Sequence, residues 1–144
     1  MEYLVGVLLA MVLCGGAAFL EFDRDRAFYP IALIVIASYY VLFAAMSGAY
    51  GALLAETAIA SAFILTAVIG FKKNLWLVVV GLASHGILDF MHHLIVENPG
   101  VPIWWPGFCL AADVVFAGLL AVLLLKRSNI AVKRNASQAA RPLP

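Results

Sequence analysis

Five long apolar runs constrain the fold of this chain more than any other feature. They cover residues 3–20, 30–46, 50–70, 75–96 and 107–125, and each approaches the length of about 20 residues that a helix needs to cross a bilayer. Of all residues, 65% are hydrophobic and only 12% are charged, whereas a soluble domain is about half apolar and about a quarter charged. The sequence therefore predicts an all-α integral membrane bundle of five transmembrane helices.

The first run has one feature of a secretory signal peptide, because Gly16, Ala17 and Ala18 resemble a cleavage site. The residues before the run carry Glu2 and no lysine or arginine, which is unlike the basic start of such a signal. We therefore expect residues 3–20 to remain in the protein as its first helix.

The positions of the basic residues predict an orientation. All nine Lys and Arg lie after the first run, after the third run, or after Leu125, so five helices place them all on one side. By the positive-inside rule, the N-terminus is outside the plasma (inner) membrane and the C-terminus is cytoplasmic. We expect one multi-pass transmembrane domain, residues 1–125, and a basic, disordered cytoplasmic tail, residues 126–144, whose Ser, Gln and Pro are typical of disorder.

The connections carry helix-end signals. Pro30 suits the first turn of a helix, where its missing N–H costs nothing, and Asn74 is a candidate N-cap. Residues 97–106 hold three prolines and a glycine, so they cannot continue a helix. The paired Trp104 and Trp105 in this segment are typical of a membrane–water boundary.

The fourth run contains every histidine of the protein. At about 100° of rotation per residue, His85, Asp89 and His92 share one stripe of a helix, and His93 lies beside it. Ionisable groups at membrane depth are costly and usually face a bundle interior, a partner or a water-filled cavity. This stretch is therefore the candidate functional region.

Carboxylates from two other helices reach the same depth. At about 1.5 Å per residue, Glu56 and Asp113 lie roughly 9 Å below the outer ends of their helices, close to the level of Asp89 and His92. We therefore expect one internal polar cluster in the outer half of the bundle, with His85 beneath it.

Other polar side chains are expected to be structural. Tyr39 and Tyr40 come to the same level, and we expect packing aromatics that each make one hydrogen bond. Cys14 and Cys109 lie in apolar runs and are expected to be buried as small hydrophobic residues. They can form a disulfide only if their two helices bring them together.

A metal site is the sharpest interpretation of the cluster. Neutral imidazoles and carboxylates are the usual N and O ligands of Zn, Fe or Mn. On this interpretation His85, Asp89 and His92 bind the metal, and Glu56 or Asp113 is a further ligand or the general base of an enzyme. Its partners are the lipid bilayer and a lipid-like or small apolar substrate, and we expect no nucleic-acid partner.

Two other interpretations use the same side chains. Carboxylates and imidazoles also build the proton or ion pathway of a small transporter. Alternatively, they form a satisfied network of hydrogen bonds and ion pairs that fixes helix register in an accessory subunit without chemistry. The spacing i, i+4, i+7 is common by chance, so the sequence leaves these interpretations open.

With these residues placed, the chain resembles a family of small, uncharacterised bacterial integral membrane proteins. The stretches that carry the resemblance are residues 25–30, 37–44 and 84–93, and residues 102–109 running on to Asp113. This family implies a membrane fold and brings no activity with it. A looser chemical likeness is to intramembrane hydrolases of the alkaline ceramidase type, which combine Ser, Asp and three His. It implies roles for Ser84, His85, Asp89, His92 and His93, although those hydrolases have seven helices and distribute their histidines over several.

Overall fold

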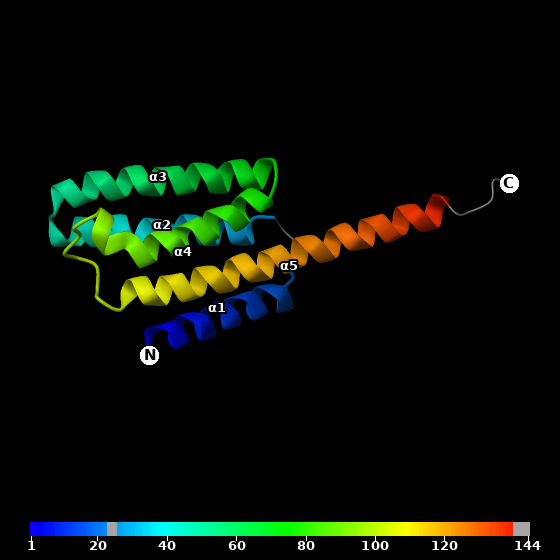
Figure 1. The fold of residues 1–144 in the computed structure, drawn as a ribbon, viewed down its shortest axis with the longest axis horizontal. Coiled ribbons are helices and arrows are strands. Elements are labelled where there is room, and N and C mark those ends of the chain that lie inside the picture. Colours follow the sequence, from blue (N-terminus) through cyan, green and yellow to red (C-terminus); the bar gives the residue numbers. More distant parts are fainter. Residues whose placement is uncertain (23–25, 140–144) are drawn as a thin grey trace.

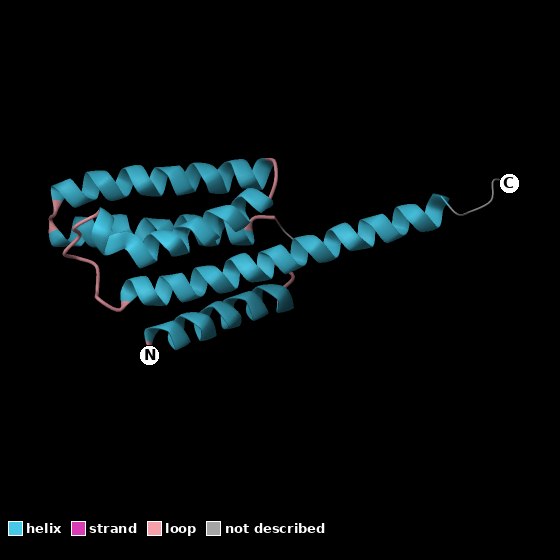
Figure 2. Cartoon of the chain, in the orientation of Figure 1, coloured by secondary structure: helices cyan, strands magenta, loops and turns pink. Residues whose placement is uncertain are grey.

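The computed structural model describes residues 1–22 and 26–139, and every regular element in this part of the chain is an α-helix (Figure 2). The helices are α1 (Glu2–Phe19), α2 (Phe28–Ser47), α3 (Tyr50–Lys72), α4 (Trp76–Ile95) and α5 (Trp105–Ala139). All five are long and apolar enough to cross a membrane. The prediction of five such helices is confirmed, and it fits a multi-pass membrane protein.

The helix-end signals of the sequence lie at the helix ends. Pro30 is the third residue of α2, inside its first turn. The N-cap of α4 is Leu75 rather than the predicted Asn74, but the Asn74 side-chain oxygen accepts a hydrogen bond from the Trp76 N–H at 3.0 Å at the start of this helix. Pro99 and Pro102 lie in the non-helical connection between α4 and α5.

The turn between α2 and α3 is closed by Gly48, whose φ of 69° is left-handed. Glycine adopts this conformation without the steric cost of a Cβ. The N–H groups of Gly48 and Ala49 donate to the carbonyls of Ala45 and Ala44, which satisfies the last carbonyls of α2. The two helices therefore form a tight antiparallel hairpin.

The end of α5 differs from the sequence prediction. We expected disorder from Lys126 onward, but α5 continues as an exposed helix to Ala139, and this extension projects beyond the bundle (Figure 1). Residues 126–139 contain no Gly or Pro and are rich in Ala, Lys and Arg, which favour helices. Extending an existing helix also needs no new nucleus. The disorder predicted for residues 140–144 and the charged residues 23–25 lie outside the described residues.

The order of the helices in the bundle does not follow their order in the sequence, because α1 packs on α5. Figure 1 shows α1 beside α5, α5 beside α4, and α3 on the opposite side of the molecule from α1. The residues that α1 buries are all small: Gly6, Ala10, Cys14 and Ala17. A Cβ at Gly6 would collide with the carbonyl oxygen of Phe108. Small residues are what close packing of apolar helices requires, so this stripe accounts for the docking of α1 on α5.

The two ends of the bundle differ in charge. One end, here called the hairpin end, consists of the α2–α3 turn, the α4–α5 connection and the first turn of α1. The other, the basic end, consists of the α1–α2 and α3–α4 connections and the point where α5 leaves the bundle. The described basic residues belong to the basic end or to the α5 extension beyond it: Arg26, Lys72, Lys73, Lys126, Arg127, Lys133 and Arg134.

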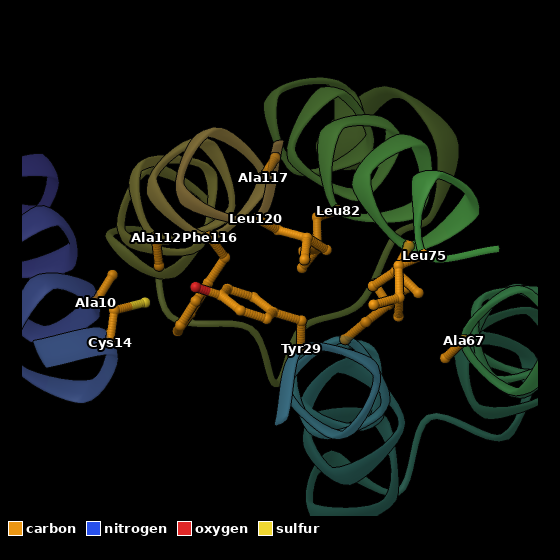
Figure 3. Packing of buried hydrophobic residues seen from close by; sticks show 12 residues of the cluster. Ala10, Cys14, Tyr29, Ala67, Leu75, Leu82, Ala112, Phe116, Ala117 and Leu120 are labelled. Atoms are coloured by element: carbon orange, nitrogen blue, oxygen red, sulfur yellow. The ribbon is translucent and has the colours of Figure 1, made fainter. Parts of the chain in front are cut away.

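The main apolar core lies toward the basic end. It is formed by the buried residues shown in Figure 3, which include Tyr29, Leu75, Leu82, Phe116 and Leu120. The hairpin end has only a small apolar cluster of Ala44, Ala52 and Val96. The interior between these two clusters is occupied by polar side chains, and this is where the candidate site lies.

Candidate metal centre

Five acidic or histidine side chains are buried in the hairpin half of the bundle, each at most 4% exposed: Glu56, His85, Asp89, His92 and Asp113. The prediction that they face the interior is therefore confirmed. They come from three helices, α3, α4 and α5. They do not form a single cluster but two groups, which Tyr40 of α2 joins.

The first group consists of His85, Asp89 and Asp113 and is called the His–Asp–Asp group below. The Nδ1 atom of His85 lies 2.8 Å from Asp113 Oδ2 and 3.4 Å from Asp89 Oδ2. One potential ligand atom from each residue lies within 4.8 Å of the others, so the group could hold a metal ion. His85 and Asp89 are one turn apart on α4 and share a face for that reason, while Asp113 comes from α5.

Gly86 permits the close approach of α4 and α5 that this group needs. A Cβ on Gly86 would lie 3.3 Å from both the Asp113 Cβ and a methyl group of Leu110. The bare face at Gly86 therefore lets α5 pack closely enough to bring the Asp113 carboxylate to His85.

The group has more acceptor atoms than donors. Tyr40 donates its hydroxyl to Asp89 Oδ1 at 2.6 Å, and His85 meets Asp113 Oδ2. Asp89 Oδ2 and Asp113 Oδ1 are buried without a hydrogen-bond partner among the described residues. Two carboxylates against one imidazole leave an excess of negative charge even when the imidazole is protonated. Because a buried uncompensated charge costs several kcal/mol, the group needs a further cation or proton.

The second group is the Glu–His pair, Glu56 of α3 and His92 of α4. Glu56 Oε1 lies 2.7 Å from His92 Nε2 and also accepts a hydrogen bond from the Asn98 amide at 3.0 Å. The Tyr40 ring stacks on the His92 ring, with centroids 4.2 Å apart and planes 24° apart. Tyr40 thus contacts the Glu–His pair with its ring and the His–Asp–Asp group with its hydroxyl.

The structure divides the predicted ligands between the two groups. The sequence assigned His85, Asp89 and His92 to a metal and kept Glu56 and Asp113 as further ligands or general bases. His85 and Asp89 do lie together, but their third neighbour is Asp113, while the Nε2 of His92 is taken by Glu56. Helical periodicity identifies the shared face of α4, but only the packing of α3 and α5 determines which carboxylate meets which histidine.

Asn98 is a site residue that the sequence reasoning missed. Besides Glu56, its amide donates to the Tyr40 carbonyl at 3.1 Å, and its side-chain oxygen accepts the Gly100 N–H. A Cβ at Gly100 would collide with the Phe43 carbonyl oxygen, so this connection packs directly on α2. An asparagine two residues before a glycine, in the connection after the histidine helix, was the available signal.

Other expectations have mixed outcomes. Tyr40 makes its one expected hydrogen bond, and Cys14 and Cys109 are buried and free, as expected. Ser84 lies on an exposed face, where its hydroxyl donates to the Val80 carbonyl. His93 is also exposed. The roles implied by the ceramidase-type likeness therefore do not assemble around the buried groups.

A cavity connects the buried residues with the hairpin end. It has a volume of about 590 Å³ and is bordered by α4, the α4–α5 connection and the first turns of α1 and α5. Asp89 and His92 line it, so one member of each polar group faces this space. The cavity thus borders both groups, although Asp89 is fully buried and His92 is only 4% exposed.

No protein-family model matches the chain, and neither curated proteins nor solved structures yield a match. The functional argument therefore depends on the chemistry of the site. One imidazole nitrogen and several carboxylate oxygens are suitable donors for a divalent transition metal. The same side chains can also exchange protons.

Proposed function

We propose that this protein is a plasma-membrane metalloprotein with one divalent transition-metal ion (Zn, Fe or Mn) at His85, Asp89 and Asp113. We further propose that it is an enzyme acting on a lipid-like or small apolar substrate. The observation that carries the proposal is the pair of buried carboxylate oxygens without a hydrogen-bond partner, Asp89 Oδ2 and Asp113 Oδ1, beside the His85 imidazole. A divalent ion held by these three residues would supply the missing positive charge.

The arrangement of charges supports insertion with the hairpin end outside. The described basic residues gather at the basic end and on the α5 extension, and the positive-inside rule assigns such an end to the cytoplasm. A reporter fused at the C-terminus is expected to be cytoplasmic and one inserted between Pro99 and Pro102 external. An external signal from the C-terminal fusion would overturn the proposed orientation.

The two groups divide the proposed chemistry. A bound divalent ion would supply Lewis-acid activation of a water molecule or a substrate carbonyl. Tyr40 holds Asp89 in place through its hydroxyl. The Glu–His pair, next to the same cavity, would accept the proton that an attacking water molecule loses and return it to the leaving group of the substrate, as a carboxylate and an imidazole do in general acid–base catalysis.

An apolar groove supports the proposed substrate class. A groove of about 650 Å³ lies between α1, α2 and α5 and is lined almost wholly by apolar side chains, among them Leu13, Ile36 and Phe116. It reaches Cys109, which is one turn before Asp113 on α5. An acyl chain or similar apolar body can lie in such a groove with its reactive end toward the buried groups.

Metal content of the purified protein tests this proposal. We expect about one divalent ion per chain after stringent washing, and its loss in Asp89→Asn and Asp113→Asn, which remove a charge but keep the side-chain shape. His92→Gln is the matched control, because His92 belongs to the Glu–His pair: it should keep the metal and lose turnover. Absence of metal from the wild type, or equal metal in all four proteins, would refute the metal site.

A proton or ion pathway is the second candidate, because the two polar groups meet at Tyr40. The Tyr40 hydroxyl donates to Asp89 of the His–Asp–Asp group, and its ring stacks on His92 of the Glu–His pair. A proton that crosses between the groups would need a water molecule to bridge this stacking contact. This candidate predicts proton flux into liposomes that Glu56→Gln or Asp113→Asn blocks, and no stoichiometric metal. A purely structural network predicts neither flux nor metal.

A further inference from the structure

The cavity at the hairpin end has a distinctive set of polar lining residues. They are Glu2, Asp89, His92, His93, Glu97 and Asn98. Among the described residues no lysine or arginine lines it. Every formal charge around the cavity is therefore acidic, apart from imidazoles that can be neutral and the amino group of Met1, 3.2 Å from the Glu2 carboxylate.

Two of these carboxylates, Glu97 and Asp89, have acceptor atoms without a hydrogen-bond partner in the described part of the chain or have no ion-pair partner there. Glu97 is exposed and has no ion-pair partner in the described part of the chain. Asp89, at the inner wall, is fully buried, and its Oδ2 atom lacks a hydrogen-bond partner. The cavity thus has an exposed carboxylate, Glu97, at its mouth and the buried Asp89 carboxylate at its inner wall.

The helix ends around the cavity do not reverse this charge. The first turns of α1 and α5 and the last turn of α4 border it, and each helix end carries about half an elementary charge, positive at an N-terminus and negative at a C-terminus. Their sum is therefore about half a positive charge. This is less than the charge of one carboxylate, so the side chains determine the sign.

We propose that this cavity is a cation-selective vestibule, which concentrates small cations from the hairpin side and leads them to Asp89 while it repels anions. The proposal extends the metal-centre hypothesis by naming the entry route of the ion. It also restricts which solutes reach the site from this side: a neutral or cationic molecule can enter here, whereas a free phosphate or carboxylate is repelled. Oxygen and imidazole groups on the wall can replace part of the water shell of an entering divalent ion.

Charged thiol reagents test the vestibule without any metal. Val101 lines the cavity, so Val101→Cys in a Cys14→Ala/Cys109→Ala background places one thiol inside it. In metal-free protein in detergent, the reaction rate of this thiol is measured with two methanethiosulfonate reagents. One carries a cationic trimethylammonium-ethyl group and the other an anionic sulfonatoethyl group. Each rate is divided by the rate of the same reagent with a free thiol. Asn74→Cys, beside Lys72 and Lys73 at the basic end, is the matched control.

We expect the Val101→Cys thiol to prefer the cation and the Asn74→Cys thiol to prefer the anion. One unit charge about 8 Å away in water changes the local concentration of a singly charged reagent about twofold. Adding Glu97→Gln should therefore lower the cation-to-anion ratio about fourfold, and Glu97→Lys should lower it further. High salt should reduce the preference by screening.

An equal rate for both reagents, a preference for the anion, or no effect of Glu97→Gln would overturn the proposal. Failure of both reagents to react with Val101→Cys would show that the cavity is closed, which overturns the proposal as well. Ile103→Cys, at the exposed mouth of the same cavity, gives the same test if Val101→Cys does not fold. This test does not depend on bound metal. A charge preference at Val101→Cys, together with a purified wild type that holds no metal, would therefore refute the metal centre and leave the vestibule standing.

Discussion

The two halves of the bundle use the same helices for different purposes. Toward the basic end, the inward face of α2 carries Leu33 and that of α4 carries Leu82, both fully buried in the apolar core. About two turns along α2 and one turn along α4, the same faces carry Tyr40 and His85, which belong to the polar interior. The change occurs without a break in either helix.

This comparison separates stability from chemistry. Burial of apolar side chains and close packing stabilise the half near the basic end. The half near the hairpin end forgoes part of that packing and instead keeps five acidic or histidine side chains at most 4% exposed. Such groups are retained at a free-energy cost when they are functional, so the two halves should respond differently to substitution.

The largest effect is expected in the polar half. His92→Leu leaves the Glu56 carboxylate buried with only Asn98 as a partner, and breaking a buried pair in this way costs about 3–5 kcal/mol. The free energy of unfolding in detergent measures it. The double variant Glu56→Gln/His92→Leu is the control and should recover most of the loss. A loss below about 1 kcal/mol would mean that the pair is not buried as a charged pair.

A cavity in the apolar half should cost slightly less and leave the chemistry intact. Leu82 is fully buried, so Leu82→Ala is expected to lower the free energy of unfolding by about 3 kcal/mol without changing metal content. Leu54→Ala, at a position 76% exposed on α3, is the matched control and should change little. If Leu82→Ala also removed the metal, the two halves would not be separable.

The smallest effect is expected at Gly86, where α4 contacts α5 beside Asp113. Gly86→Ala places a methyl group 3.3 Å from the Asp113 Cβ and should cost about 1–2 kcal/mol through overpacking. It should also weaken metal binding, because α5 shifts relative to His85. Gly118→Ala on α5, where a Cβ meets open space, should be neutral or slightly stabilising. Equal metal affinity in both variants would contradict the role assigned to Gly86.

The sequence predicts the elements well because their signals are local. Apolar length sets the five helices, Asn74 and Pro30 act at the ends where they were expected, and the shared face of His85 and Asp89 follows from helical period alone. The burial of Glu56 and Asp113 was also predictable, because a charged side chain in an apolar helix is costly toward lipid and usually faces the bundle interior.

The partners of these side chains were not predictable, because they depend on helix packing. Asp113, and not the predicted His92, joins His85 and Asp89, because α5 packs closely on α4 at Gly86. His92 instead pairs with Glu56 of α3. The docking of α1 on α5 depends on Gly6, whose bare Cα was not recognised as a contact point. The continuation of α5 after Lys126 was missed because polar composition was taken as disorder, although nothing in residues 126–139 breaks a helix.

The central claim is that a metal ion is bound by His85, Asp89 and Asp113. Its most direct test is X-ray absorption spectroscopy at and beyond the absorption edge of the bound metal. The His–Asp–Asp group predicts one imidazole and otherwise oxygen ligands, at about 2.0–2.2 Å for zinc, with no sulfur. His85→Ala should lose the bound metal, as Asp89→Asn and Asp113→Asn do, and His92→Gln should leave the spectrum unchanged. A spectrum with two imidazoles, a sulfur ligand from Cys109, or a first shell that changes in His92→Gln would contradict the assignment of the metal to His85, Asp89 and Asp113.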